Sequence, residues 1–123
     1  VDEAKIAQEA GVEAIVVSNH GGRVLDTTPG TAEVLEEIAL TVGDEVTVLV
    51  DGGIRAGVDI LKALALGADA VLVGRPLIIG AFGGGKEGVQ SILDKMTTEL
   101  KKAMILTGCN SITEINAKIL SNS

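Results

Sequence analysis

The residues best equipped for chemistry lie in one stretch, Ser18-Asn19-His20-Gly21-Gly22-Arg23. His20 is the only histidine of the chain, and Arg23 follows it by three positions. A neutral imidazole can accept a proton near neutral pH, and a guanidinium can bind a carboxylate through two hydrogen bonds. This pair therefore suits removal of hydrogen from a carbon atom beside a carboxylate. The competing interpretation is a histidine that only serves its loop and an arginine in solvent.

The position of this stretch favours the functional interpretation. The apolar residues 12–17 precede it and predict a short buried parallel strand over 13–17. The stretch would then begin a loop, residues 18–30, at the carboxyl end of a strand, where parallel α/β folds bind ligands. The two glycines after His20 would let the backbone approach a flat ligand closely.

Two further strand ends carry a related pattern of glycine and arginine. Residues 46–50 and 70–73 predict strands, followed by Asp51-Gly52-Gly53-Ile54-Arg55 and by Gly74-Arg75. In barrels, the loops after the last strands commonly bind phosphate through backbone N–H groups and a helix N-terminus. The glycines would expose the amides and the arginines would supply charge, whereas Asp51 would pair with a hydroxyl group or an arginine. The alternative is that the glycines only make tight turns.

The remaining pattern is helical and alternates with the strands, which predicts an α/β fold with a parallel sheet and right-handed crossovers. Helices are expected over residues 2–10, over 31–42 with Thr31 as N-cap, and up to residue 66. A helical turn and a glycine-rich loop over 77–85 precede a long amphipathic helix over 86–107, whose apolar stripe should pack on the sheet. A capping box at 111–114 predicts a final helix to residue 120.

Composition limits the class of protein. The chain has 123 residues, enough for one domain, and its core must come from aliphatic residues because it has one Phe and neither Tyr nor Trp. A net charge of −7 argues against nucleic acid or an anionic membrane as a partner. The single cysteine, Cys109, excludes an internal disulfide and fits the cytoplasm, and no apolar run is long enough for a membrane span. We expect no metal site.

With these residues in hand, the chain resembles the FMN-dependent 2-hydroxy-acid oxidases and dehydrogenases, the family of glycolate oxidase and lactate oxidase. The matching pieces are residues 18–23, 51–55, 62–68 and 74–76. They occur in the order and spacing of the family, and the resemblance covers nearly the whole chain. The histidine motif is its most specific part.

The resemblance implies a fold, a cofactor and a reaction. The fold would be the C-terminal portion of a TIM (β/α)8 barrel, with three parallel strands and their helices. FMN would accept two electrons as a small L-2-hydroxy acid is oxidised to the 2-oxo acid, with His20 as the base and Arg23 binding the substrate carboxylate. The cofactor-binding residues would be the strand-end set: Asp51, Gly52, Gly53, Arg55, Gly74 and Arg75.

Two departures from the family limit this expectation. Val24 stands where members usually carry glutamine, and only the last three of eight strands are matched. A complete barrel needs about 250 residues, so we interpret residues 1–123 as a single C-terminal half-barrel fragment. Its open edges should pair with the missing N-terminal half or with another copy.

Two alternatives remain open at this point. One is another phosphate-binding barrel, such as inosine-monophosphate dehydrogenase or type 2 isopentenyl-diphosphate isomerase, whose relatives lack the His-Gly-Gly-Arg sequence. The other is a half-barrel without catalytic activity.

Overall fold

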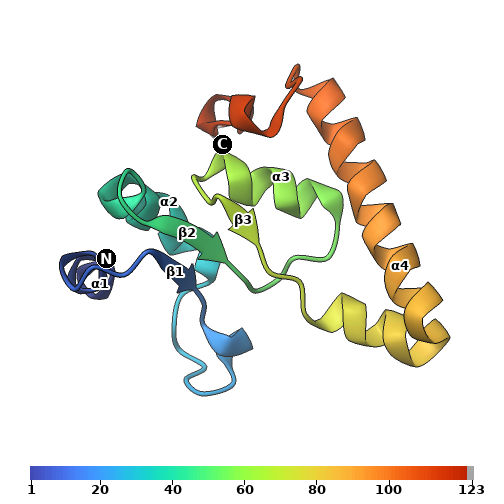
Figure 1. Cartoon of the computed structure of the whole chain (residues 1–123), viewed down its shortest axis with the longest axis horizontal. Helices are drawn as coiled ribbons and strands as arrows, with labels where there is room; N and C mark the ends of the chain where they lie inside the picture. The colour runs from blue at the N-terminus through green and yellow to red at the C-terminus, as the bar shows by residue number, and fades with distance from the viewer. Residues whose placement is uncertain (122–123) are drawn as a thin grey trace.

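The sheet has three parallel strands in the order β1-β2-β3, as the sequence predicts. The computed structural model describes residues 1–121. Its strands and helices alternate along the chain (Figure 1): α1 (Asp2–Glu9), β1 (Ala14–Val17), α2 (Thr31–Val42), β2 (Thr47–Val50), α3 (Gly57–Ala65), β3 (Ala70–Val71) and α4 (Arg75–Leu106). The strands are one or two residues shorter than predicted. No helix within residues 1–121 is long and apolar enough to cross a membrane.

The two faces of the sheet differ in burial. Successive strand residues point to opposite faces, and the covered face consists of Ile15, Val17, Val48, Val50 and Val71. Its residues pack with Leu35, Ile38 and Val42 of α2 in the main core cluster. The open face consists of Ala14, Val16, Thr47, Leu49, Ala70 and Leu72, of which Val16 is 47% and Leu72 45% exposed. The prediction of buried strands is therefore correct for one face only.

Helix α4 is bent into two arms at Gly84 and Gly85, whose backbone angles are not helical. The glycine-rich segment, predicted as a loop, is thus a tight non-helical break between two helical arms. Gly80 and Gly88, on either side of the kink, lie so close that a Cβ on either would collide with the other's backbone. The first arm begins shortly after β3. Because of the kink, the second arm runs back beside α3 (Figure 1).

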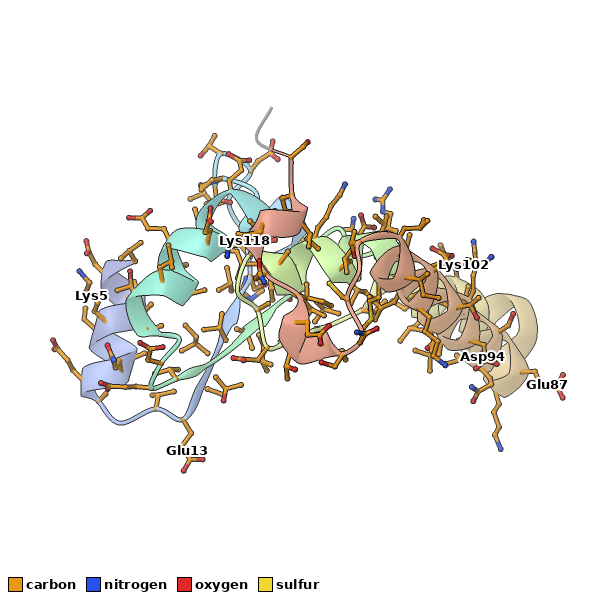
Figure 2. The ribbon with its side chains drawn as sticks, turned by 90° about the horizontal axis from the view of Figure 1, so that it is seen from above. Lys5, Glu13, Glu87, Asp94, Lys102 and Lys118 are labelled. Atoms are coloured by element: carbon orange, nitrogen blue, oxygen red, sulfur yellow. The ribbon has the colours of Figure 1, made fainter. Side chains whose placement is uncertain are left out.

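The apolar stripe of α4 packs against α3, so the prediction that it lies on the sheet is wrong. Leu100, Ala103 and Met104 join a second core cluster with Leu61 and Leu64 of α3. The kink directs the long arm past the sheet, and Glu87 and Asp94 lie at its far end, away from the strands (Figure 2).

The predicted final helix over 111–120 is also wrong, because two short 3-10 turns, Ile112–Glu114 and Ala117–Ile119, take its place. The Glu114 carboxylate accepts the N–H of Asn110 at 2.6 Å instead of returning to Ser111. Ile115 has an extended backbone and is buried in the second cluster beside Cys109. Burial of Ile115 therefore outweighs the local capping signal, and Cys109 serves as a buried apolar residue.

Candidate functional site

The turn that carries His20 directly follows β1 and has an unusual backbone. His20 has a φ of +53°, the only positive φ at a residue other than glycine within residues 1–121, and Gly21 and Gly22 follow at +65° and +72°. The left-handed region is disfavoured for residues with a Cβ and is found most often where function requires it. Ser18 Oγ accepts the N–H of His20 at 3.2 Å, and Asn19 Oδ1 accepts the N–H of Gly21 at 3.0 Å. These bonds hold an exposed imidazole in a strained turn.

The ends of β2 and β3 expose backbone amides. Gly52 and Gly53 have φ values of +91° and +73°, and a Cβ added at Gly53 or Gly74 would meet open space. Within residues 1–121, the N–H groups of Gly52, Gly53, Gly74 and Arg75 donate to no protein acceptor. Free amides beside arginine side chains form a setting suited to an anion.

One cavity of about 320 Å³ joins the three strand ends. His20 and Gly21 come from the first, residues 51–55 from the second, and residues 72–76 from the third. Seven of the eight predicted site residues line it: His20, Asp51, Gly52, Gly53, Arg55, Gly74 and Arg75. Arg23 does not line it. Its N–H donates to the carbonyl of His20 at 3.2 Å, while its side chain is exposed outside the cavity.

Contacts between the loops hold the cavity wall together. The Thr31 hydroxyl donates to the carbonyl of Asp51 at 2.7 Å, and this threonine is only 7% exposed. The N-cap of α2 is Gly30 rather than Thr31, so the predicted capping role of Thr31 is wrong by one residue. A Cβ on Gly21 would lie 2.9 Å from Arg75 Nη2, which places that guanidinium against the histidine turn.

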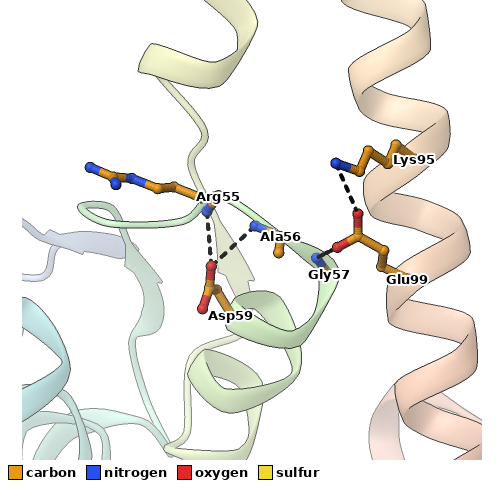
Figure 3. Close-up of polar contacts among 6 residues, drawn as sticks. All are labelled: Arg55, Ala56, Gly57, Asp59, Lys95 and Glu99. Carbon is orange, nitrogen blue, oxygen red and sulfur yellow. Dashed lines mark hydrogen bonds and ion pairs between the residues drawn. The ribbon is translucent and has the colours of Figure 1, made fainter.

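Sequence reasoning missed two carboxylates that close the N-terminus of α3 (Figure 3). Asp59 Oδ2 accepts the N–H groups of Arg55 and Ala56 at 3.0 and 3.1 Å. Glu99 Oε2, from α4, accepts the N–H of Gly57 at 3.0 Å. Three amides at this end of α3 are thus taken by carboxylates, whereas the strand-end amides and that of Arg75 at the start of α4 are free to meet an anion in the cavity. Asp59 stands at a recognisable capping position, whereas nothing local indicates Glu99.

No group of three or more histidine, cysteine, aspartate or glutamate side chains within residues 1–121 is arranged to hold a metal ion.

Comparison with known proteins gives a consistent family. A sequence profile described as FMN-dependent dehydrogenase matches residues 1–122. A 2-hydroxyacid oxidase of Dictyostelium discoideum is 51% identical over 118 residues, which are 96% of this chain and 30% of the relative. A peroxisomal (S)-2-hydroxyacid oxidase of Arabidopsis thaliana is 50% identical over 114 residues, 93% of this chain and 31% of the relative. The chain thus spans about a third of the length of the relatives it matches.

Solved structures agree on the fold. A mandelate oxidase crystal structure superposes with a TM-score of 0.91 at 47% identity, covering 94% of this chain and 35% of that one. A second, of the Y128F variant of mandelate oxidase, gives a TM-score of 0.89 at 49% identity, covering 91% and 34%. The three parallel strands and their helices are accordingly part of a TIM barrel. By sequence and by structure, the chain belongs to the family of FMN-dependent dehydrogenases.

Proposed function

We propose that this chain supplies the histidine and phosphate-binding side of a flavoenzyme that oxidises a small L-2-hydroxy acid to the 2-oxo acid. The observation that carries the proposal is the single cavity in which His20 meets both glycine-arginine strand ends. The relatives named as 2-hydroxyacid oxidases and mandelate oxidase support the same class of substrate.

The residues of the cavity suit FMN. Its phosphate carries negative charge and accepts hydrogen bonds, and the free amides of Gly53, Gly74 and Arg75 supply donors at neighbouring strand ends. Arg55 and Arg75 add positive charge, and open space beside the glycines admits a phosphate or ribityl chain close to the backbone. Asp51 and Gly52 complete the wall beside them. We propose that these six residues hold the cofactor.

His20 and Arg23 act on the substrate in this proposal. When bound there, FMN would supply the acceptor for the two electrons and for one of the two protons that leave the substrate. His20 accepts a proton from the substrate, for which its exposed position on the cavity wall is suitable. Arg23 binds the substrate carboxylate, which requires its side chain to turn toward the cavity because it does not line the cavity here.

Replacing the base tests this assignment. In the full-length protein, His20→Ala should lower kcat for a 2-hydroxy acid by about 10²- to 10⁴-fold, the usual contribution of a general base. Bound flavin, measured by its visible absorbance, should stay at the wild-type level. Glu87→Ala, on the far arm of α4, is the matched control and should leave both unchanged. Wild-type turnover by the His20→Ala variant would refute the role of the base.

The proposal also concerns residues 1–123 as a fragment of the barrel. We infer that they form a single half-barrel unit, which by itself would fold, and could bind phosphate, but would not catalyse the oxidation. We propose that the remaining barrel, or a second copy, covers the open face and the outer edges of β1 and β3.

We propose that the protein is located in the cytoplasm. Microscopy of a tagged full-length protein would distinguish this location from the peroxisome, since the Arabidopsis relative is named as a peroxisomal enzyme.

A further inference from the structure

Three consecutive backbone amides at the start of α3 all donate to carboxylates. Asp59 takes the N–H groups of Arg55 and Ala56, and Glu99 takes that of Gly57 (Figure 3). A helix N-terminus left open would attract an anion of its own. Here two carboxylates of the protein take three of the amides, while the N–H of Val58 has no protein acceptor within residues 1–121.

The same bonds set the position of one loop that lines the cavity, the loop after β2. Asp59 fixes the backbone of Arg55, which ends the loop after β2. Glu99 belongs to α4, the helix that begins with Arg75 at the loop after β3. Gly57 allows this approach, because any Cβ there would collide with the backbone of Glu99 and Leu100. Glu99 lies on the second arm of α4, beyond the kink at Gly84 and Gly85, so its bond to Gly57 fixes the end of the Arg55 loop against that arm.

We propose that Asp59 and Glu99 are positioning residues for the phosphate end of FMN. They hold the backbone of Arg55 and the end of its loop in place, and their negative charge disfavours a phosphate at the start of α3. This inference rests on the proposed function, since it concerns the cofactor assigned there.

The negative charge of these carboxylates and their role as hydrogen-bond acceptors have opposite expected effects on FMN affinity, and substitutions can separate the two effects. A carboxylate near a phosphate repels it, so loss of charge alone would tighten FMN binding. Loss of the hydrogen-bond acceptor would instead release the Arg55 loop and weaken binding. Asp59→Asn removes the charge and keeps an acceptor, whereas Asp59→Ala removes both.

The experiment compares FMN with riboflavin, which lacks the phosphate. Dissociation constants of both are measured on the full-length protein from the quenching of flavin fluorescence. We expect Asp59→Ala to lower the preference for FMN over riboflavin about tenfold and Glu99→Ala about threefold, in keeping with two lost hydrogen bonds against one. Asp59→Asn should retain the wild-type preference or exceed it. Asp94→Ala, which loses only a bond from Gln90 on the same helix, should change neither affinity.

The outcomes separate the two proposals. A wild-type protein that binds FMN no better than riboflavin contradicts the phosphate site and this inference with it. A wild-type preference for FMN that survives both alanine variants contradicts this inference alone. So does an equal loss of both flavins, which is the mark of a general structural role, or tighter FMN binding by Asp59→Ala. If Asp59→Ala does not fold, Glu99→Ala decides, because it removes one of the three bonds.

Discussion

The two faces of the sheet have nearly the same composition and very different environments. Val48 on the covered face is fully buried beneath the helices, whereas Val16 on the open face, in the neighbouring strand, is 47% exposed. Apart from Thr47 on the open face, both faces are aliphatic, a composition typical of strands in parallel sheets that are covered on both sides. In a closed barrel the open face would be the interior, filled by side chains from other strands.

Within residues 1–121, the sheet is therefore covered on its helical face and uncovered on the face that would line a barrel interior. Helices supply local partners within the chain, whereas a barrel interior needs strands from the whole circumference. The predictions below test this contrast, beginning with the helical layer.

Gly57→Ala should have the largest effect, because the added Cβ would collide with the backbone of α4 at Glu99 and Leu100. We expect a loss of about 3 kcal/mol in the free energy of unfolding, at the upper end of overpacking costs. Gly83→Ala is the control, since its Cβ would meet open space within a helix. There the better helix propensity of alanine should stabilise by up to about 1 kcal/mol. Urea denaturation measures both, and equal effects would contradict close packing of the helices.

Val48→Ala and Val16→Ala compare the two faces directly with one substitution. On the covered face we expect a loss of about 2 kcal/mol, from two buried methyl groups and the cavity they leave. On the open face of residues 1–123 alone, the loss should stay below about 0.5 kcal/mol. In the full-length protein the Val16→Ala cost should rise toward that of Val48→Ala. A Val16→Ala cost that is the same in both lengths would mean that nothing covers this face.

Thr31→Val probes the rim where the helical layer meets the cavity. The variant keeps the shape of the side chain but loses the bond to the Asp51 carbonyl, which should cost about 1 kcal/mol. Thr41→Val is the matched control, because the Thr41 hydroxyl bonds only to Glu37 within its own exposed helix turn. Its effect on thermal unfolding should be close to zero. A similar change in Tm for both variants would contradict a stabilising role for the hydrogen bond between Thr31 and Asp51 in the cavity wall.

Much of the fold follows from local pattern. Three apolar runs with intervening helical periods suffice for the parallel sheet, because chain connectivity and handedness leave few arrangements. The errors occur where distant residues decide the outcome. Ile115 has an extended rather than a helical backbone because it is buried in the second cluster. The apolar stripe of α4 packs against α3 because the glycine kink changes the direction of the helix. Neither partner is visible in the local sequence.

The candidate site follows the same rule. Strand ends marked by glycine and arginine identify seven residues that do line one cavity, because parallel strands bring their carboxyl ends to one edge. The direction of the Arg23 side chain depends on a loop rather than on a strand, and sequence spacing alone placed it beside His20. Glu99 lies 42 positions from the amide that it accepts, so no motif could indicate it.

Because the strands are parallel, the carboxyl ends of all three strands lie at one edge of the sheet, beside the cavity, and their amino ends lie at the opposite edge. Every cavity residue follows the end of a strand, while the turns that lead into β1, β2 and β3 lie at the opposite edge. Asp44 and Glu45, in the turn before β2, are exposed there. This turn is accordingly a suitable place to attach a fluorophore, a surface linker or an inserted peptide, at the greatest remove from the chemistry that the strands support.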